Sequence, residues 1–91
     1  MFNKNSLKMN NLFKALDDPT RRKILQMLND GSLNAGQIAQ AFEMTKPSIS
    51  KHLDILKNAD FVKAEKKGQF VYYTLNKNTI KKVVKWLDKL T

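Results

Sequence analysis

The sequence predicts a mainly α-helical domain with a small β-hairpin (α+β), in the order helix, helix, helix, helix, strand, strand, helix. Three observations predict this class. Apolar residues recur at helical spacing up to residue 60, a segment rich in β-branched and aromatic residues follows, and another helical pattern closes the chain. A chain of 91 residues has room for a single domain with one core.

The N-terminal third of the chain predicts two helices. Residues 1–8 are mostly polar and we expect them to fray, which places the domain at residues 9–91. Asp18 is a candidate N-cap for the second helix, because Pro19 suits a first helical turn. The first helix is predicted from apolar residues that share one face: Met9, Leu12, Phe13 and Leu16.

Two further helices are predicted on either side of a tight turn. The third covers residues 35–42 with Asn34 as its cap, and residues 43–45 form the turn. Thr45 or Lys46 then caps the fourth helix, in which Pro47 stands near the first position. The buried stripe of this helix is Ile49, Leu53 and Leu56. The helix is expected to end near Asp60, which can take the left-handed conformation that stops a helix.

A short helix, a tight turn and a longer helix together form the layout of a helix-turn-helix, whose second helix enters the major groove of DNA. Rotation by about 100° per residue from the buried stripe turns Pro47 and Lys51 away from the core. Lys51 can donate to guanine, and Ser48 and Ser50 can bind bases or phosphates. The alternative for the serines is that they only cap the helix start.

The segment after residue 60 predicts a β-hairpin. Strands are expected at residues 61–65 and 69–75, with a basic tip at Lys66-Lys67-Gly68. A hairpin directly after a helix-turn-helix makes the winged variant of that fold. The tip lysines either are simply solvated or reach phosphate or the minor groove. The aromatic residues of the second strand are interpreted as hairpin packing: Phe70, Tyr72 and Tyr73.

His52 is the single histidine of the chain. It lies at the edge of the buried stripe of the fourth helix, so a contact to phosphate or the groove edge and a packed role both remain open. Because the chain has no Cys and no second His, a metal site at His52 is not expected.

The overall charge is basic, with 17 Lys and Arg against 8 Asp and Glu and a formal net charge of +9. Such a surface is either simply well solvated or attracts a polyanion. Paired carboxylates, a nucleophile–base set and a Gly-rich phosphate loop are missing from the sequence pattern, so we expect no enzyme and no cofactor. Residues 1–11 lack the apolar run of a signal peptide, and no stretch approaches the ~20 apolar residues of a membrane span, so no membrane insertion is expected.

The first and last helices carry more apolar surface than one small core requires. Small DNA-binding proteins commonly dimerise, so that two recognition helices face successive segments of the major groove. Asn76 is expected to cap the last helix, whose Lys77, Lys81, Lys85 and Lys89 form a solvated back. The expected homodimer interface consists of Leu12, Phe13, Leu16, Ile80, Val83, Val84, Trp86, Leu87 and Leu90.

Taken together, these motifs resemble the ArsR/SmtB family of winged-helix repressors. Residues 12–16 and 18–25 are similar to the opening of the family, residues 46–53 (Lys-Pro-Ser-Ile-Ser-Lys-His-Leu) to its recognition helix, and residues 67–73 to its wing. Two runs, Lys-Pro-Ser-Ile-Ser and Lys-Gly-Gln-Phe, resemble the SdpR-type branch of autorepressors. With this resemblance, the residues expected at DNA are Lys46, Pro47, Ser48, Ser50, Lys51, His52, Lys66, Lys67 and Gln69.

The resemblance also implies a contact of Arg21 or Arg22 with the DNA backbone, or a pair with Asp17 or Asp18. The ligand motifs of metal-sensing members are missing, and Ala-Asp-Phe at residues 59–61 replaces the usual Ala-Gly-Leu.

The expected function is a homodimeric, sequence-specific repressor of transcription that binds double-stranded operator DNA, acts at its own promoter and senses no metal. It is expected in the bacterial cytoplasm, on the nucleoid when bound. A regulatory protein partner, a ligand- or metal-responsive sensor and a protein-interaction module remain alternatives.

Overall fold

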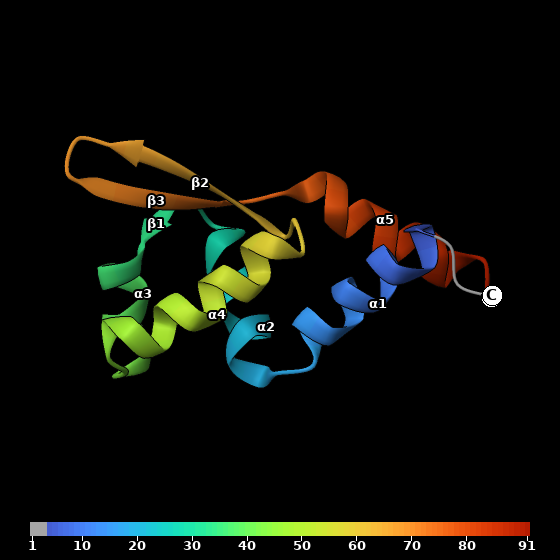
Figure 1. Ribbon diagram of the computed structural model, residues 1–91, viewed down its shortest axis with the longest axis horizontal. Helices are drawn as coiled ribbons and strands as arrows, with labels where there is room; N and C mark the ends of the chain where they lie inside the picture. Colours follow the sequence, from blue (N-terminus) through green and yellow to red (C-terminus); the bar gives the residue numbers. More distant parts are fainter. Residues whose placement is uncertain (1–3) are drawn as a thin grey trace.

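The computed structural model describes the backbone of residues 4–91 and the side chains of residues 9–91 (Figure 1). The predicted order of helices and hairpin is confirmed, with one additional short strand. Helix α1 begins at Lys4. The fraying expected for residues 1–8 stays a prediction, and residues 1–3 of that segment lie outside the described residues. The elements are α1 (Lys4–Leu16), α2 (Pro19–Leu28), β1 (Leu33–Asn34), α3 (Ala35–Phe42), α4 (Lys46–Asn58), β2 (Val62–Lys67), β3 (Phe70–Leu75) and α5 (Lys77–Asp88).

The sheet has three antiparallel strands in the order β1-β3-β2, whereas the sequence predicted only two. In β1, Leu33 pairs with Tyr73 and Asn34 with Tyr72. A strand of two residues is too short to show alternation, and Asn34 also serves as the N-cap of α3. The third strand therefore fixes the start of α3 against the hairpin.

The corner between α1 and α2 is organised by Asp18. Its carboxylate accepts hydrogen bonds from the backbone N–H groups of Thr20 at 2.8 Å and Arg21 at 3.2 Å, which confirms the predicted N-cap. Partial burial raises the pKa of Asp18, but the bonds from the backbone N–H groups of Arg21 and Thr20 and the charge of Arg21 outweigh it, so the pKa is lowered from 3.8. The ionised carboxylate thus stabilises the start of α2.

We expect Asp18→Ala to lower the free energy of unfolding by about 1 kcal/mol, or about 4–8 °C in Tm. The matched control is Asp17→Ala, which removes the same charge from the exposed neighbouring residue. Because folding lowers the pKa of Asp18, its contribution is complete above 3.8 and is lost as the pH falls through the folded-state pKa. Thermal unfolding at neutral and acidic pH measures both effects. Equal Tm values for the two variants would contradict this role.

The turn between α3 and α4 is fixed by backbone conformation and by caps. Glu43 ends α3 in the left-handed region with φ of 54°. Thr45 caps α4, since its Oγ1 accepts from the Ser48 N–H at 3.3 Å, and Pro47 stands in the first turn. The sequence prediction of this turn and of the α4 start is confirmed.

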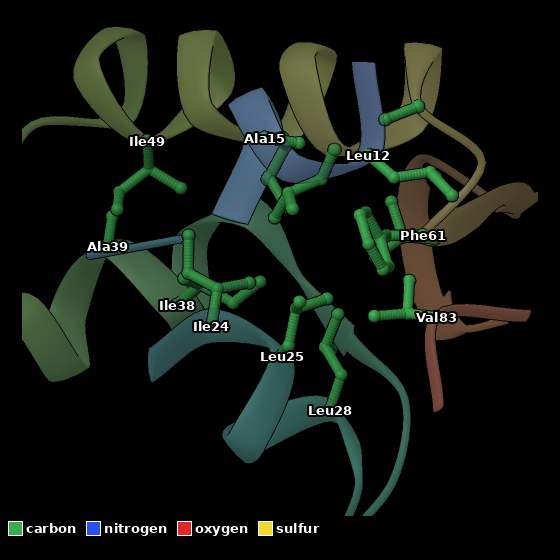
Figure 2. Packing of buried hydrophobic residues seen from close by; sticks show 14 residues of the cluster. Leu12, Ala15, Ile24, Leu25, Leu28, Ile38, Ala39, Ile49, Phe61 and Val83 are labelled. Carbon is green, nitrogen blue, oxygen red and sulfur yellow. The ribbon is translucent and has the colours of Figure 1, made fainter. Parts of the chain in front are cut away.

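The core lies between all five helices and the beginning of the hairpin, with Leu12 and Ala15 from α1 and Val83 from α5 (Figure 2). Its largest fully buried side chains include Phe61, Ile24, Ile38, Ile49, Leu53 and Leu56. Phe61 follows Asp60, which takes the predicted left-handed conformation with φ of 62°. The Phe61 N–H donates to the Leu56 carbonyl at 2.9 Å and its carbonyl accepts from the Asn76 N–H at 2.8 Å. Phe61 therefore joins the end of α4 to the base of the wing and to the segment before α5.

The elongated molecule separates two surfaces, because its extents are 43 × 23 × 20 Å. Along the longest axis, the tip of the β2–β3 hairpin and the start of α4 lie toward one end, and α1 and α5 lie together at the other (Figure 1). Asn76 stands at the N-cap of α5, but the expected side-chain cap is missing; its backbone N–H binds the Phe61 carbonyl instead.

Candidate nucleic-acid interface

Helix α4 presents the predicted recognition residues at its N-terminal end. Lys46, Pro47 and Lys51 are exposed, as the rotation from the buried stripe predicts, whereas Ser48 and Ser50 are half-buried. The exposed amines of Lys46 and Lys51 and the positive end of the helix dipole make this end a donor-rich surface. Such a surface can bind phosphate oxygens and the acceptor atoms of guanine.

Ser48 has a local role in addition to its predicted one. Its backbone N–H binds Thr45, and its Oγ accepts a hydrogen bond from the Thr45 Oγ1 at 3.0 Å. The hydroxyl therefore belongs to the cap of α4, which is the alternative that the sequence left open. It retains a free donor for a second partner.

The tip of the β2–β3 hairpin, the wing, is shorter than the sequence predicted. β2 continues through Lys66 and Lys67, and Lys67 pairs with Phe70, so the turn consists of Gly68 and Gln69 alone. Gly68 has φ of 63°, which a glycine adopts without steric cost at the first central position of such a turn. Because successive strand residues face opposite sides, the two exposed lysines leave opposite faces of the hairpin.

His52 lies on the flank of α4 that faces the α1–α2 corner. It is half-buried, and its Nδ1 lies 3.3 Å from the Nη1 of Arg21. Arg21 also donates from Nε to the Ala15 carbonyl at 2.6 Å. The sequence suggested that Arg21 or Arg22 pairs with Asp17 or Asp18. Instead, the Arg22 side chain donates to the Leu16 carbonyl at 2.7 Å. Sequence reasoning missed the contact with His52 because the two residues are 31 positions apart.

The nine residues expected at a dimer interface divide into two groups. Leu12 and Val83 are buried in the core of the protomer itself, and Leu16 and Ile80 pack against that core. Because α1 and α5 cover the domain's own core, these four residues are largely internal to the protomer, and their contact with a second copy stays a prediction. The other five remain exposed at the α1–α5 end: Phe13, Val84, Trp86, Leu87 and Leu90.

Two of these exposed apolar side chains meet across α1 and α5. The rings of Phe13 and Trp86 meet edge to face with centroids 5.4 Å apart, so the two helices share one surface. Beside it, α1, α5 and the end of α4 line an open hollow of about 490 Å³, whose lining includes Met9, Trp86, Lys82, Lys85 and Lys89. We call the five exposed residues Phe13, Val84, Trp86, Leu87 and Leu90 the apolar face.

The described part of the chain contains neither a membrane-spanning helix nor a cluster of metal ligands. Its helices are all too short or too polar to cross a membrane. Within the same residues, no three His, Cys, Asp or Glu side chains come together as a metal site would require.

Comparisons with known proteins agree with this arrangement. The family model described as "Bacterial regulatory protein, arsR family" matches residues 18–64, from the α2 cap to the first half of β2. The transcriptional repressor SdpR of Bacillus subtilis (strain 168) is 52% identical over 79 residues, which are 87% of this chain and 88% of SdpR.

Two solved structures share the fold. HlyU from Vibrio cholerae N16961 superposes with a TM-score of 0.78 at 34% identity, covering 98% of this chain and 97% of HlyU. The homodimeric winged helix-turn-helix DNA-binding domain from Mycobacterium bovis has a TM-score of 0.77 at 26% identity, covering 90% of this chain and 79% of that one. The predicted winged helix-turn-helix fold is thereby confirmed, and the chain belongs to the ArsR family of bacterial transcriptional regulators.

Proposed function

We propose that the chain is a homodimeric repressor of transcription that binds double-stranded operator DNA through α4 and the wing. The observation that carries the proposal is the start of α4, where Lys46 and Lys51 are exposed on a helix that Ile49 and Leu53 anchor in the core. A rigidly held helix with donors at its exposed end is the arrangement that reads base edges in a major groove. The surplus of 17 basic over 8 acidic residues favours a polyanionic partner.

The apolar face supports the homodimer. Leu90 is 68% exposed and Val84 50%, and an apolar surface of this kind on a small basic domain marks an interaction site. A two-fold dimer formed there would carry two recognition helices, which must lie about 34–36 Å apart to reach successive major-groove segments. The Mycobacterium bovis domain with the same fold is described as homodimeric.

Repression at the chain's own promoter is proposed from the similarity to SdpR, which is named a transcriptional repressor. A dimer bound across a promoter excludes RNA polymerase, so binding alone is sufficient for repression. Since HlyU is named a transcriptional activator, the sign of regulation has to be measured. A reporter gene behind the upstream region of the chain's own gene is expected to fall in expression when the protein is supplied, and a rise would contradict repression.

The proposal includes no metal sensing, because the sequence offers no Cys and a single His, while zinc sites require several such ligands. Addition of Zn²⁺ is expected to leave the affinity for DNA unchanged. A protein partner that relieves repression remains part of the proposal as a route for regulation, and the place of action is the nucleoid in the cytoplasm.

Titration of labelled duplex tests the DNA-binding function. The probe spans the region upstream of the chain's own gene, and the control is a scrambled duplex of the same length and base composition. We expect preference for the upstream duplex, with log K falling linearly against log salt by ~0.9 per neutralised phosphate. Equal affinity for both duplexes would overturn sequence-specific binding.

Lys51→Ala and Lys67→Ala are expected to separate base reading from phosphate binding. Loss of Lys51 should cost ~1–3 kcal/mol on the upstream duplex and relax specificity, because we propose that its exposed amine donates to a base edge. Loss of Lys67 should weaken both duplexes equally and reduce the salt slope by about 1. Lys81→Ala, on the exposed back of α5, is the charge-matched control. Equal losses on both duplexes for Lys51→Ala would assign Lys51 to phosphate instead.

A further inference from the structure

The guanidinium of Arg21 lies where three helices meet. Its Nε donates to the Ala15 carbonyl at 2.6 Å and its Nη2 to the Lys14 carbonyl at 3.2 Å, both in the last turn of α1. Its Nη1 lies 3.3 Å from the Nδ1 of His52 in the middle of α4. The carbonyls at a helix end have no partner within the helix, so Arg21 caps α1 and reaches α4 with the same side chain.

The neighbouring Arg22 makes fewer contacts than Arg21. Arg22 is exposed and donates only from Nη1 to the Leu16 carbonyl, whereas Arg21 is half-buried and engages all three of its nitrogens. A planar guanidinium held at three points is fixed in orientation. Arg21 therefore sets a geometry between α1 and α4, while Arg22 is tethered to α1 alone.

The contact also determines the protonation of His52. Arginine keeps its protons and can only donate, so Nδ1 must accept and the ring must be neutral with its hydrogen on Nε2. A doubly protonated ring would place two cations 3.3 Å apart. Among the side chains of residues 9–91, no buried nitrogen or oxygen lacks a partner, and Nε2 has no bond within this part, so Nε2–H reaches solvent.

Asp18 completes the surroundings of His52. Its carboxylate is held by the N–H groups of Thr20 and Arg21 at the start of α2, and its charge attracts the guanidinium of Arg21. This anion lies on the same corner between α1 and α2 that Arg21 caps. The corner thus connects α1, which carries part of the apolar face, to the recognition helix.

We propose that Arg21 is a positioning residue for DNA recognition: it locks α4 to the end of α1 and fixes His52 as a neutral Nε2–H donor toward DNA. This inference rests on the proposed DNA-binding function. Arg21 then acts through His52 and not by direct contact with phosphate. The substitution Arg21→Lys distinguishes positioning through His52 from direct phosphate contact, because lysine keeps the charge but cannot hold three acceptors in one plane.

The first experiment is done without DNA. A long-range ¹H–¹⁵N spectrum shows which ring nitrogen of a histidine carries hydrogen, and the chain has a single His, so the signal needs no assignment. We expect the Nε2–H tautomer in the wild type and in Arg22→Lys, and a mixture of tautomers in Arg21→Lys. Hydrogen on Nδ1 in the wild type would overturn the proposal.

The second experiment measures affinity for the upstream and scrambled duplexes, with Tm recorded for each variant. Arg21→Lys is expected to weaken upstream binding on the order of 10-fold and scrambled binding by less than about 2-fold, while the charge-matched Arg22→Lys stays within about 2-fold on both. In a His52→Gln background, which keeps a donor near Nε2 but removes the Nδ1 acceptor, Arg21→Lys should cost less than about 2-fold.

The outcomes separate the two claims. Equal losses for Arg21→Lys and Arg22→Lys, or an undiminished effect of Arg21→Lys in the His52→Gln background, overturn the positioning role. A wild type without preference for the upstream duplex overturns the proposed function itself, and the tautomer spectrum still decides whether Arg21 holds His52.

Discussion

Phe61→Ala is expected to destabilise the domain by about 3–5 kcal/mol, as for other buried phenylalanines truncated to alanine. The side chain is 0% exposed and lies where α4 ends and the wing begins. Because single domains are stable by only about 5–15 kcal/mol, this loss removes a large part of the folding free energy. It should lower Tm by more than about 12 °C, measured by circular dichroism at a fixed protein concentration.

The matched control is Phe70→Ala, the same change at an aromatic residue of the wing that is 46% exposed. Its only recorded ring contact in the described part of the chain is with Tyr72 at 6.5 Å, so we expect a loss of about 1 kcal/mol or less. Phe61→Leu should lie between the two, because leucine retains most of the apolar volume. If Phe61→Ala and Phe70→Ala lowered Tm equally, the junction would not depend on Phe61.

Leu87→Glu is expected to convert the homodimer into a folded monomer. Leu87 is 46% exposed and belongs to the apolar face, and in a two-fold dimer formed there the new carboxylate would be desolvated. Loss of the linked second half-site should lower affinity for the upstream duplex by ~10²–10⁴-fold. Sedimentation velocity gives the oligomeric state, and duplex titration gives the affinity.

Lys81→Gln is the control for this experiment, because it changes the net charge by the same single unit on the exposed back of the same helix. It should remain dimeric and bind DNA with at most a small loss. A Leu87→Glu variant that stays dimeric, or that becomes monomeric with unchanged affinity, would contradict the role of the apolar face in operator binding.

Local signals made most of this fold predictable. Asp18 before Pro19, Asn34 before α3 and Thr45 before Pro47 each formed the cap that their side chains predict. Asp60 ended α4 in the left-handed conformation expected of it. The exposed face of α4 followed from the spacing of its buried stripe, because helical period alone relates the two.

The features that the sequence did not predict depend on contacts between segments that lie far apart in the chain. β1 exists because Leu33 meets Tyr73, and a strand of two residues has no pattern of its own. The contact of Arg21 with His52 joins two helices that only the folded chain brings together. Likewise, sequence periodicity cannot separate an internal apolar residue such as Val83 from an external one such as Val84, because both lie within the broad apolar side of α5.

Nuclease footprinting on the upstream region of the chain's own gene tests the central claim most directly. We expect two protected half-sites related by two-fold symmetry, with centres about 34–36 Å, or one helical turn, apart, and occupancy by two chains. Protection should weaken with added salt and with Lys51→Ala. Uniform protection without half-sites, or none at concentrations where the protein is dimeric, would contradict a sequence-specific dimeric repressor.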